Sequence, residues 1–198
     1  MKKIFFVGAQ GTGKSTLNRF IFDHPGLRRE LHIKKSIDSI SKMFFSDFSI
    51  FKKLNSPEFY EAQVKILVYA SNLYLNTENF ISSRGFADSY AYLMHYVSKT
   101  KNKNGLILID TVKIFQEFLN QEEGVYTFYV PVAFDISDKN NNLRSNNLDF
   151  QQEIDIHIQQ FLKITNTKYI IVKGSLEQRK KIIYNTITAD LFRHENIT

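Results

Sequence analysis

Short apolar runs alternate with amphipathic stretches along the whole chain. Five of the runs have the length and composition of buried strands: 3–7, 31–35, 80–83, 125–130 and 168–172. Apolar residues at helical spacing predict helices over 14–22, 57–75, 87–98 and 148–164, with a final helix after 175. Alternating strands and helices predict an α/β fold in three layers. Its central sheet is five-stranded and mainly parallel, with helices on both faces.

Two segments allow more than one interpretation. Residues 36–45 are ambiguous, with some apolar residues at helical spacing. Residues 105–120 open with an apolar run that ends at Asp110, as in a strand that carries a magnesium-binding aspartate. Their apolar positions nevertheless continue at helical spacing, so we favour a helix in which Asp110 is a surface acid.

Turn and capping residues mark several boundaries. Asp-His-Pro-Gly at 23–26 predicts a turn, and Ser56 before Pro57 predicts a helix start. Ser175 with Gln178 forms a capping-box pattern for the last helix. Residues 135–147 are polar and rich in Asn, which predicts a mobile loop.

The first predicted strand leads into Gly-Ala-Gln-Gly-Thr-Gly-Lys-Ser at 8–15, a complete G-x-x-x-x-G-K-S sequence between a strand and a helix. In such a phosphate-binding loop, glycines let successive N–H groups point at phosphate oxygens. The lysine reaches the β- and γ-phosphates, and the serine hydroxyl ligates Mg²⁺. The predicted nucleotide-binding residues are Gly8, Gln10, Gly11, Thr12, Gly13, Lys14, Ser15 and Thr16.

Phosphoryl transfer also needs a carboxylate and further cations near the phosphates. Arg84 follows the third predicted strand, and Asp88 lies four residues later on the first turn of a helix. Asp38, after the second predicted strand, is a candidate for Mg²⁺ binding or for the acceptor base. Arg144, in the loop with Asp138, is a candidate to close over the phosphates. Each of these residues also has a plainer interpretation, as a helix cap or a solvated surface charge.

The composition of the chain indicates its domain number and its expected location, and excludes some kinds of chemistry. The chain of 198 residues fits one domain, it has no cysteine, and no stretch is long and apolar enough to span a membrane. We therefore expect a cytoplasmic protein without disulfides or thiolate metal sites. The net charge of +6 suits an anionic ligand, but the basic residues are scattered, so we favour a solvated surface as their explanation.

These motifs resemble the compact P-loop kinases grouped with the ATPase domain of ribosylnicotinamide kinases, a group that includes many phage-encoded nucleotide kinases. The resemblance rests on segments spread over almost the whole chain. They are 8–15, Ser-Arg-Gly-Phe-Ala-Asp-Ser-Tyr-Ala-Tyr at 83–92, Tyr-Val-Pro-Val-Ala-Phe at 129–134, Arg-Ser at 144–145 and Lys-Gly-Ser-Leu-Glu-Gln-Arg at 173–179.

The resemblance implies a P-loop kinase fold that uses ATP and magnesium. It places Arg84 and Asp88 near the acceptor, makes Arg144 a lid arginine, and brings Gly174 and Ser175 to the adenine. The chain departs from the family at Ser83, where an acid usually precedes the arginine. It departs again after the second strand, where the acidic motif is reduced to Asp38.

The function that we predict is transfer of the ATP γ-phosphate to a nucleoside or nucleoside monophosphate, with Asp88 or Asp38 as the base. Two alternatives remain open: a kinase that acts on a base or an end of DNA, and an NTP-dependent switch without a small acceptor. A homodimer is possible. Five aromatic residues have the potential to stack on an acceptor base, although core packing is the commoner role at such spacing: Phe44, Phe45, Phe59, Tyr60 and Tyr92.

Overall fold

The computed structural model describes residues 1–38, 40–41, 56–101, 103–132 and 148–195. Five strands form one sheet: β1 (Lys3–Val7), β2 (Lys35–Ile37), β3 (Phe80–Ser82), β4 (Val125–Tyr129) and β5 (Ile170–Ile171). Their order is β2-β3-β1-β4-β5, and every neighbouring pair is parallel. The predicted α/β class is therefore confirmed, and the sheet is parallel throughout.

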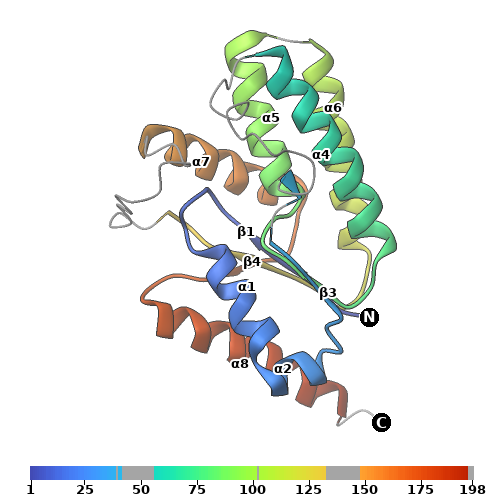
Figure 1. The fold of residues 1–198 in the computed structure, drawn as a ribbon, viewed down its shortest axis with the longest axis vertical. Coiled ribbons are helices and arrows are strands. Elements are labelled where there is room, and N and C mark those ends of the chain that lie inside the picture. Colours follow the sequence, from blue (N-terminus) through green and yellow to red (C-terminus); the bar gives the residue numbers. More distant parts are fainter. Residues whose placement is uncertain (39, 42–55, 102, 133–147, 196–198) are drawn as a thin grey trace.

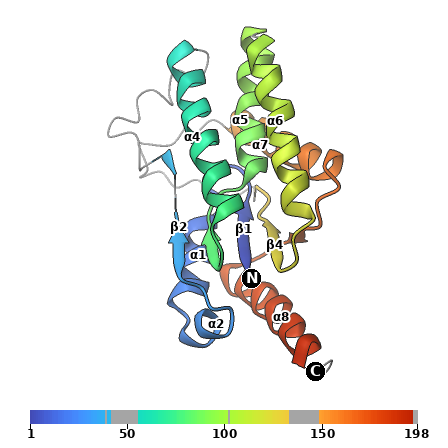
Figure 2. The same cartoon turned by 90° about the vertical axis from the view of Figure 1, so that its right-hand side faces the viewer.

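Helices cover both faces of this sheet (Figure 1). Those in the described residues are α1 (Lys14–Asp23), α2 (Pro25–Glu30), α4 (Pro57–Asn76), α5 (Phe86–Thr100), α6 (Lys103–Asn120), α7 (Leu148–Ile164) and α8 (Leu176–Glu195). The helices α4, α5, α6 and α7 lie on one side of the sheet, whereas α1, α2 and α8 lie on the other (Figure 2).

The central strand β1 shows how the sequence specifies these three layers. Its side chains point alternately to the two faces, as in any strand. Phe5 and Val7 belong to the buried cluster formed with α4, α5, α6 and α7. Ile4 and Phe6 belong to the cluster formed with α1 and α8. A strand buried on both faces is apolar at successive positions, which explains the uninterrupted run from Ile4 to Val7.

Two predictions before the second strand need correction. The predicted turn at 23–26 is present only as a break at His24 between α1 and α2, and Pro25 and Gly26 already belong to α2. The His24 ring nitrogen Nδ1 accepts a hydrogen bond from Leu27 N at 3.2 Å, and Pro25 fits the first helical turn. The predicted strand at 31–35 ends where β2 begins. Leu31 and Ile33 are buried against the α1 and α8 layer rather than paired in the sheet, so their apolar character reflects packing.

Other local predictions are confirmed. Ser56 caps α4 by accepting a hydrogen bond from Phe59 N at 3.1 Å. Residues 105–120 belong to helix α6, and its exposed Asp110 pairs with Lys113 at 2.9 Å. The ambiguous segment that ends at 45 lies largely outside the described residues, and the predicted loop at 135–147 lies wholly outside them.

The strand order determines where the functional segments meet. In a parallel sheet the carboxyl ends of all strands lie at one edge, where ligands of α/β proteins bind. The segment after β1 is the phosphate-binding loop, and the segment after the adjacent strand β3 leads into α5. Arg84 and Asp88 are therefore brought beside the loop, while Asp38 follows β2, one strand further away.

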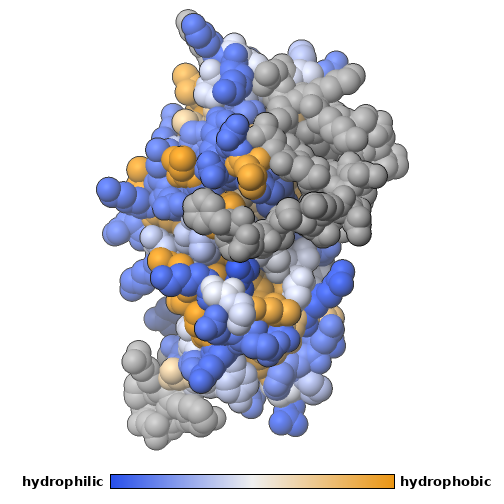
Figure 3. Space-filling view, turned by 90° about the vertical axis from the view of Figure 1, so that its left-hand side faces the viewer, coloured by the Kyte–Doolittle hydropathy of each residue, from blue (hydrophilic) through white to orange (hydrophobic). Residues whose placement is uncertain are grey.

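No helix in the described residues combines the length and apolarity that a membrane crossing requires. On the face shown in Figure 3, the coloured residues are mainly hydrophilic, and apolar residues occur in separated groups among them.

Candidate active site

The loop between β1 and α1 has a backbone path that depends on glycine at two positions. A Cβ atom added to Gly8 would lie 2.3 Å from the carbonyl oxygen of Val130, so any side chain would collide with the backbone after β4. Gly13, with φ of 91°, is the N-cap of α1 in the left-handed conformation. Helix α1 thus starts at Lys14 with its N-terminus at the carboxyl edge of the sheet, where an anion is favoured.

Lys14 is held inside this loop. Its ammonium donates to the carbonyl oxygens of Gly8 at 2.5 Å and Ala9 at 2.6 Å, and only 5% of the side chain is exposed. The same nitrogen lies 4.0 Å from Asp88 Oδ1. A phosphate that reaches Lys14 must therefore compete with two carbonyls, and the bound anion would also face a buried carboxylate.

Asp88 joins the first turn of α5 to the cationic groups. Its Oδ2 accepts a hydrogen bond from Gly85 N at 3.0 Å, which caps the helix, and its Oδ1 accepts one from Arg84 Nη1 at 2.9 Å. The cap and the ion pairs use different oxygens of one carboxylate. The two interpretations of Asp88, helix cap and site residue, are thus compatible.

Arg84 lies at the mouth of this cluster, with about a third of its side chain exposed. Burial of its inner part disfavours the charge, but the Tyr92 phenol and the Asp88 carboxylate outweigh that effect, and the pKa of Arg84 is raised. The guanidinium lies 5.8 Å from the centre of the Tyr92 ring and donates a hydrogen bond to this residue. Arg84 stays a cation with donors directed at the edge of the site.

Helices α5 and α7 each contact the loop through Gln10. The Tyr92 hydroxyl donates to Gln10 Oε1 at 2.9 Å, and Gln151 Nε2 on α7 donates to the Gln10 carbonyl oxygen at 3.2 Å. Tyr92 is half-buried and packs near Phe150, so it is neither a pure core residue nor a free stacking surface.

On the other side, α8 holds the loop through Arg179. Its Nη1 donates to the Thr12 carbonyl at 2.8 Å, and its Nε donates to the Gly174 carbonyl at 2.7 Å. Burial lowers the pKa of Arg179 from its ordinary value. The bridge connects the segment with Gly174 and Ser175 to the phosphate-binding loop. Ser175 caps α8 with Gln178 as predicted, through reciprocal bonds of 2.8 and 3.3 Å.

Asp38 lies beyond β2, half-buried, and its neighbourhood is organised by Asn18 of α1. Asn18 Nδ2 donates to the Ile37 carbonyl at 3.2 Å and to Ser83 Oγ at 3.0 Å. Ser83, which stands where the related kinases usually have an acid, is buried and bound to Asn18. It therefore supports the packing of α1 on the sheet, and the nearest acid bound to Arg84 is Asp88.

A further buried acid, Asp155 of α7, lies near the end of β4. Its Oδ2 accepts hydrogen bonds from the Tyr129 hydroxyl at 2.7 Å and from Gln159 Nε2 at 3.0 Å. Burial raises the pKa of Asp155, against the opposing effect of these bonds and of the Lys14 charge. Asp155 fastens α7 to the strand that borders the phosphate-binding loop.

The structure thus brings Lys14, Asp88 and Arg84 together, and Asp38 stands further along the same edge. Arg144 lies outside the described residues. Sequence reasoning assigned no role to four residues that hold the loop or its surroundings: Asn18, Gln151, Asp155 and Arg179. Only Arg179 carried a signal, because it closes the segment 173–179 that resembles the kinase family.

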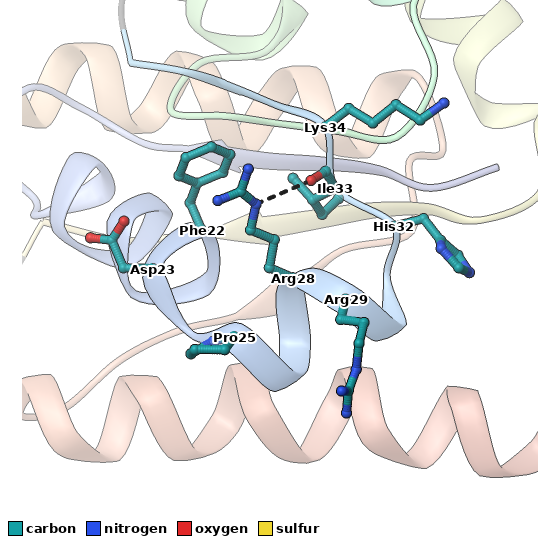
Figure 4. Close-up of a pocket in the computed structure, with 8 residues that line it drawn as sticks. All are labelled: Phe22, Asp23, Pro25, Arg28, Arg29, His32, Ile33 and Lys34. Carbon is teal, nitrogen blue, oxygen red and sulfur yellow. Dashed lines mark hydrogen bonds between the residues drawn. The ribbon is translucent and has the colours of Figure 1, made fainter.

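A second hollow lies at the opposite end of the sheet, before β2 and beside α2. It encloses about 730 Å³ and is lined by four basic residues, with Phe22, Asp23, Pro25 and Ile33. The basic residues are Arg28, Arg29, His32 and Lys34. In Figure 4 their side chains point in different directions, and the Arg28 guanidinium lies 4.2 Å from the Phe22 ring centre. These groups do not converge on one anion, so the hollow does not compete with the loop as a phosphate site.

Residues 3–179 match the family model described as an AAA domain, which is nine-tenths of the chain. The chain belongs to this family. Family membership, together with the loop geometry, identifies a P-loop nucleotide-binding domain. Among curated protein sequences, none matches the chain.

Solved structures with the same fold include a deoxyadenosine kinase, a shikimate kinase and the NadR protein. Deoxyadenosine kinase from M. mycoides with bound dCTP has a TM-score of 0.68 at 16% identity, covering 94% of this chain and 99% of that one. Shikimate kinase from Acinetobacter baumannii with shikimate has a TM-score of 0.50 at 16% identity, over 98% and 94% of the two chains. The NadR protein in complex with NR has a TM-score of 0.56 at 13% identity, over 93% of this chain and 51% of that one. At such identities these matches establish the P-loop kinase fold alone.

Proposed function

We propose that this protein is an ATP-dependent phosphotransferase whose acceptor is a nucleoside or a nucleoside monophosphate. The observation that carries the proposal is the buried cluster of Lys14, Asp88 and Arg84. A loop that only binds nucleotide needs the lysine and the backbone, whereas transfer to an acceptor needs a carboxylate and a second cation beside the terminal phosphate. Asp88 and Arg84 are these two groups, 2.9 Å apart.

Each residue then has a definite task. The loop from Gly8 to Thr16 holds the triphosphate, and Lys14 exchanges its carbonyl partners for β- and γ-phosphate oxygens. Asp88 accepts the proton of the acceptor hydroxyl, or orients that hydroxyl, and Arg84 binds the acceptor or the transferring group. Arg144 closes from the segment outside the described residues. The segment with Gly174 and Ser175, joined to the loop by Arg179, borders the adenine.

The residues present suit magnesium. Mg²⁺ in kinases is held mainly by phosphate oxygens and water, with one or two protein ligands. Ser15 follows the lysine in the first turn of α1, where its hydroxyl is a suitable ligand, and Asp38 at the same sheet edge is suited to bind through water. Within the described residues no cluster of three acidic or histidine ligands forms a protein-only metal cage, so the phosphates would complete the coordination. Magnesium would neutralise charge on the phosphates.

Two of the fold relatives support this choice of acceptor. The deoxyadenosine kinase from M. mycoides was solved with dCTP and, in a further structure, with dCMP and dCDP as products. NadR was solved with NR. A nucleoside-like acceptor therefore suits this fold, although the acceptor pocket itself consists of scattered side chains that differ between such proteins.

A panel of acceptors with ATP and Mg²⁺ tests the proposal. It should contain ribonucleosides, deoxynucleosides, their monophosphates and ribosylnicotinamide, with phosphorylated products detected by mass spectrometry. We expect one acceptor class to be phosphorylated by the wild-type protein and by the surface variant Asp110→Asn, but not by Lys14→Met. If the panel yields no product while ATP binds, the phosphotransferase proposal fails.

Two further outcomes identify the alternatives. Transfer of phosphate to DNA ends or bases, with binding that weakens steeply as salt increases, indicates a DNA-directed kinase. Slow ATP hydrolysis without any acceptor indicates a nucleotide-dependent switch.

A further inference from the structure

Five side chains form a series of contacts that leaves the phosphate-binding loop, passes through helix α5 and the residue Arg84 before it, and returns to the loop. Lys14 of the loop lies 4.0 Å from Asp88, which binds Arg84 at 2.9 Å. Arg84 donates to Tyr92, and the Tyr92 hydroxyl donates to Gln10 Oε1 at 2.9 Å, back in the loop. The chain of contacts starts at the lysine and returns to the loop four residues earlier. Gln10 is the end of this series and occupies a variable position of the phosphate-binding motif, with the fixed positions on either side.

Tyr92 determines which way the Gln10 amide faces. The hydroxyl accepts from Arg84 and donates to the amide oxygen, so Oε1 is used and Nε2 is the free end. Hydrogen bonds in such a series polarise one another, and this series begins at a cation. The Gln10 N–H groups are therefore strengthened as donors.

The other end of the amide, Gln10 Nε2, has no hydrogen-bond acceptor within the described residues. Only 9% of Gln10 is exposed, and within the described residues its Nε2 is buried without a hydrogen-bond partner. A buried donor without a partner costs free energy, and the cost disappears when a ligand supplies an acceptor. Because the unpartnered end of the amide carries only N–H groups, that ligand has to offer a lone pair. An ionised phosphate oxygen meets this condition.

Gln10 lies on the side of the loop where the terminal phosphate would lie in the proposed function. Arg179 and Gly174 hold the far side of the loop, at Thr12, where the segment after β5 arrives. Gln10 is held instead from the side of Arg84 and Asp88, where the end of the triphosphate meets the acceptor in the proposed function. A donor on that side distinguishes a triphosphate from a diphosphate.

We propose that Gln10 Nε2 donates to the γ-phosphate of the bound nucleotide, and that Tyr92 is the positioning residue that turns the amide toward it. This inference rests on the proposed use of ATP, but not on the identity of the acceptor. It assigns the third residue of the loop a part in sensing whether the nucleotide still carries its terminal phosphate.

Binding measurements test the inference without an acceptor. Affinities for Mg²⁺-ADP and for the non-hydrolysable β,γ-imido analogue of ATP should be compared by calorimetry. Gln10→Glu keeps the acceptor for Tyr92 but replaces the free donor by a negative oxygen. We expect its affinity for the ATP analogue to fall by about 10- to 100-fold, the range for a lost hydrogen bond to a charged group. Its affinity for ADP should stay within about threefold, because that ligand lacks the γ-phosphate.

Tyr92→Phe keeps the ring but removes the hydroxyl, so the Gln10 amide is free to turn either way. Its affinity for the ATP analogue should fall by about three- to tenfold, again with little change for ADP. The matched control is Tyr90→Phe on the same helix, whose ring packs on Phe161 and which should change neither affinity.

Two results would overturn the inference. One is an equal loss of ADP and ATP-analogue affinity in Gln10→Glu, which would mean that Gln10 only shapes the loop. The other is wild-type behaviour of Tyr92→Phe. A protein that phosphorylates no acceptor still gives a clear answer, because only nucleotide binding is measured.

Discussion

The ammonium of Lys14 lies 4.0 Å from the carboxylate of Asp88, and both side chains are almost completely buried. With Arg84 they form a cluster of two cations and one anion. Buried charges are tolerated when they are paired, so the acid makes it possible to keep both cations at the loop. The cluster has a net positive charge at the place where an anionic phosphate would bind.

Asp88→Asn should separate the electrostatic role of this acid from its role as a helix cap. The amide oxygen can still accept from Gly85 N, so α5 remains capped, whereas the charge beside Lys14 and Arg84 is lost. We expect kcat/KM to fall by about 100-fold or more, as for loss of a key charged group in phosphoryl transfer. The free energy of unfolding should fall by about 1–3 kcal/mol.

Asp110→Asn is the control for this variant, because Asp110 is an exposed acid paired only across the surface of α6. Asp110→Asn should change neither kcat/KM nor the free energy of unfolding measurably, since surface ion pairs contribute little to stability. Full activity in Asp88→Asn would contradict the role of Asp88.

Gly8→Ala should abolish nucleotide binding. The new Cβ would lie 2.3 Å from the Val130 carbonyl oxygen, and this backbone has little room to move because Val130 N is bonded to the Val7 carbonyl of β1. We expect destabilisation by about 1–3 kcal/mol, the usual cost of overpacking, with no detectable calorimetric signal for ATP. Gly26→Ala is the matched control. Its Cβ would meet only the His24 side chain, at 3.3 Å, and should leave binding intact. If Gly8→Ala still bound ATP, the backbone of the loop would have to move enough to accommodate the new Cβ atom, and the predicted collision would be wrong.

Arg179→Met should weaken nucleotide binding from outside the loop. It removes the bonds to the Thr12 and Gly174 carbonyls but keeps much of the buried stem. We expect about a tenfold rise in the KM for ATP, with kcat changed less, because the variant loosens the loop rather than the reacting groups. Lys180→Met, next in sequence, is the control, because Lys180 contacts exposed Glu177 and the Phe20 ring instead of the Thr12 and Gly174 carbonyls. Equal effects of the two variants on the KM for ATP would mean that Arg179 does not support the nucleotide site.

Asp155 should make stability depend on pH in a defined direction. Burial raises its pKa in the folded protein above the ordinary value of 3.8. The folded state therefore holds this proton to higher pH than the unfolded state. The stability that Asp155 contributes is full below the unfolded pKa and is lost as pH rises through the folded pKa. Urea unfolding of wild type and Asp155→Asn from about pH 3.5 to 7 measures this effect.

Because asparagine does not titrate, the free energy of unfolding of Asp155→Asn minus that of wild type should increase with pH across this window and then level off. A difference that decreases with pH would contradict the raised pKa.

How far the sequence predicts this protein depends on how local each feature is. The loop from Gly8 to Ser15 was found in full because its residues are consecutive. Asp88 and Arg84 were placed correctly because the end of a strand and the first turn of a helix fix their position on the sheet edge. The strand predicted at 31–35 was wrong because Leu31 and Ile33 are buried by packing under α2 rather than by sheet pairing. Residues buried in a paired strand and residues buried by packing outside the sheet are both apolar, so the sequence pattern does not distinguish them.

The contacts that support the loop were beyond prediction for a different reason. Gln10 meets Tyr92 and Gln151, and Thr12 meets Arg179, across 82, 141 and 167 positions of sequence. Glutamine, tyrosine and arginine have no periodicity or spacing that indicates such partners. Their pairing becomes visible only when α5, α7 and α8 are in place around the sheet.

The bond between Arg179 and Thr12 has a consequence for how the protein is made. Synthesis begins at the N-terminus, and domains assemble as the chain emerges from the ribosome. The phosphate-binding loop is synthesised before the guanidinium that supports it, because Thr12 precedes Arg179 by 167 positions. A nascent chain that ends before α8 contains the entire loop but lacks this support. Firm nucleotide binding should therefore arise only after α8 has been synthesised, and ATP should favour completion of the fold rather than its start.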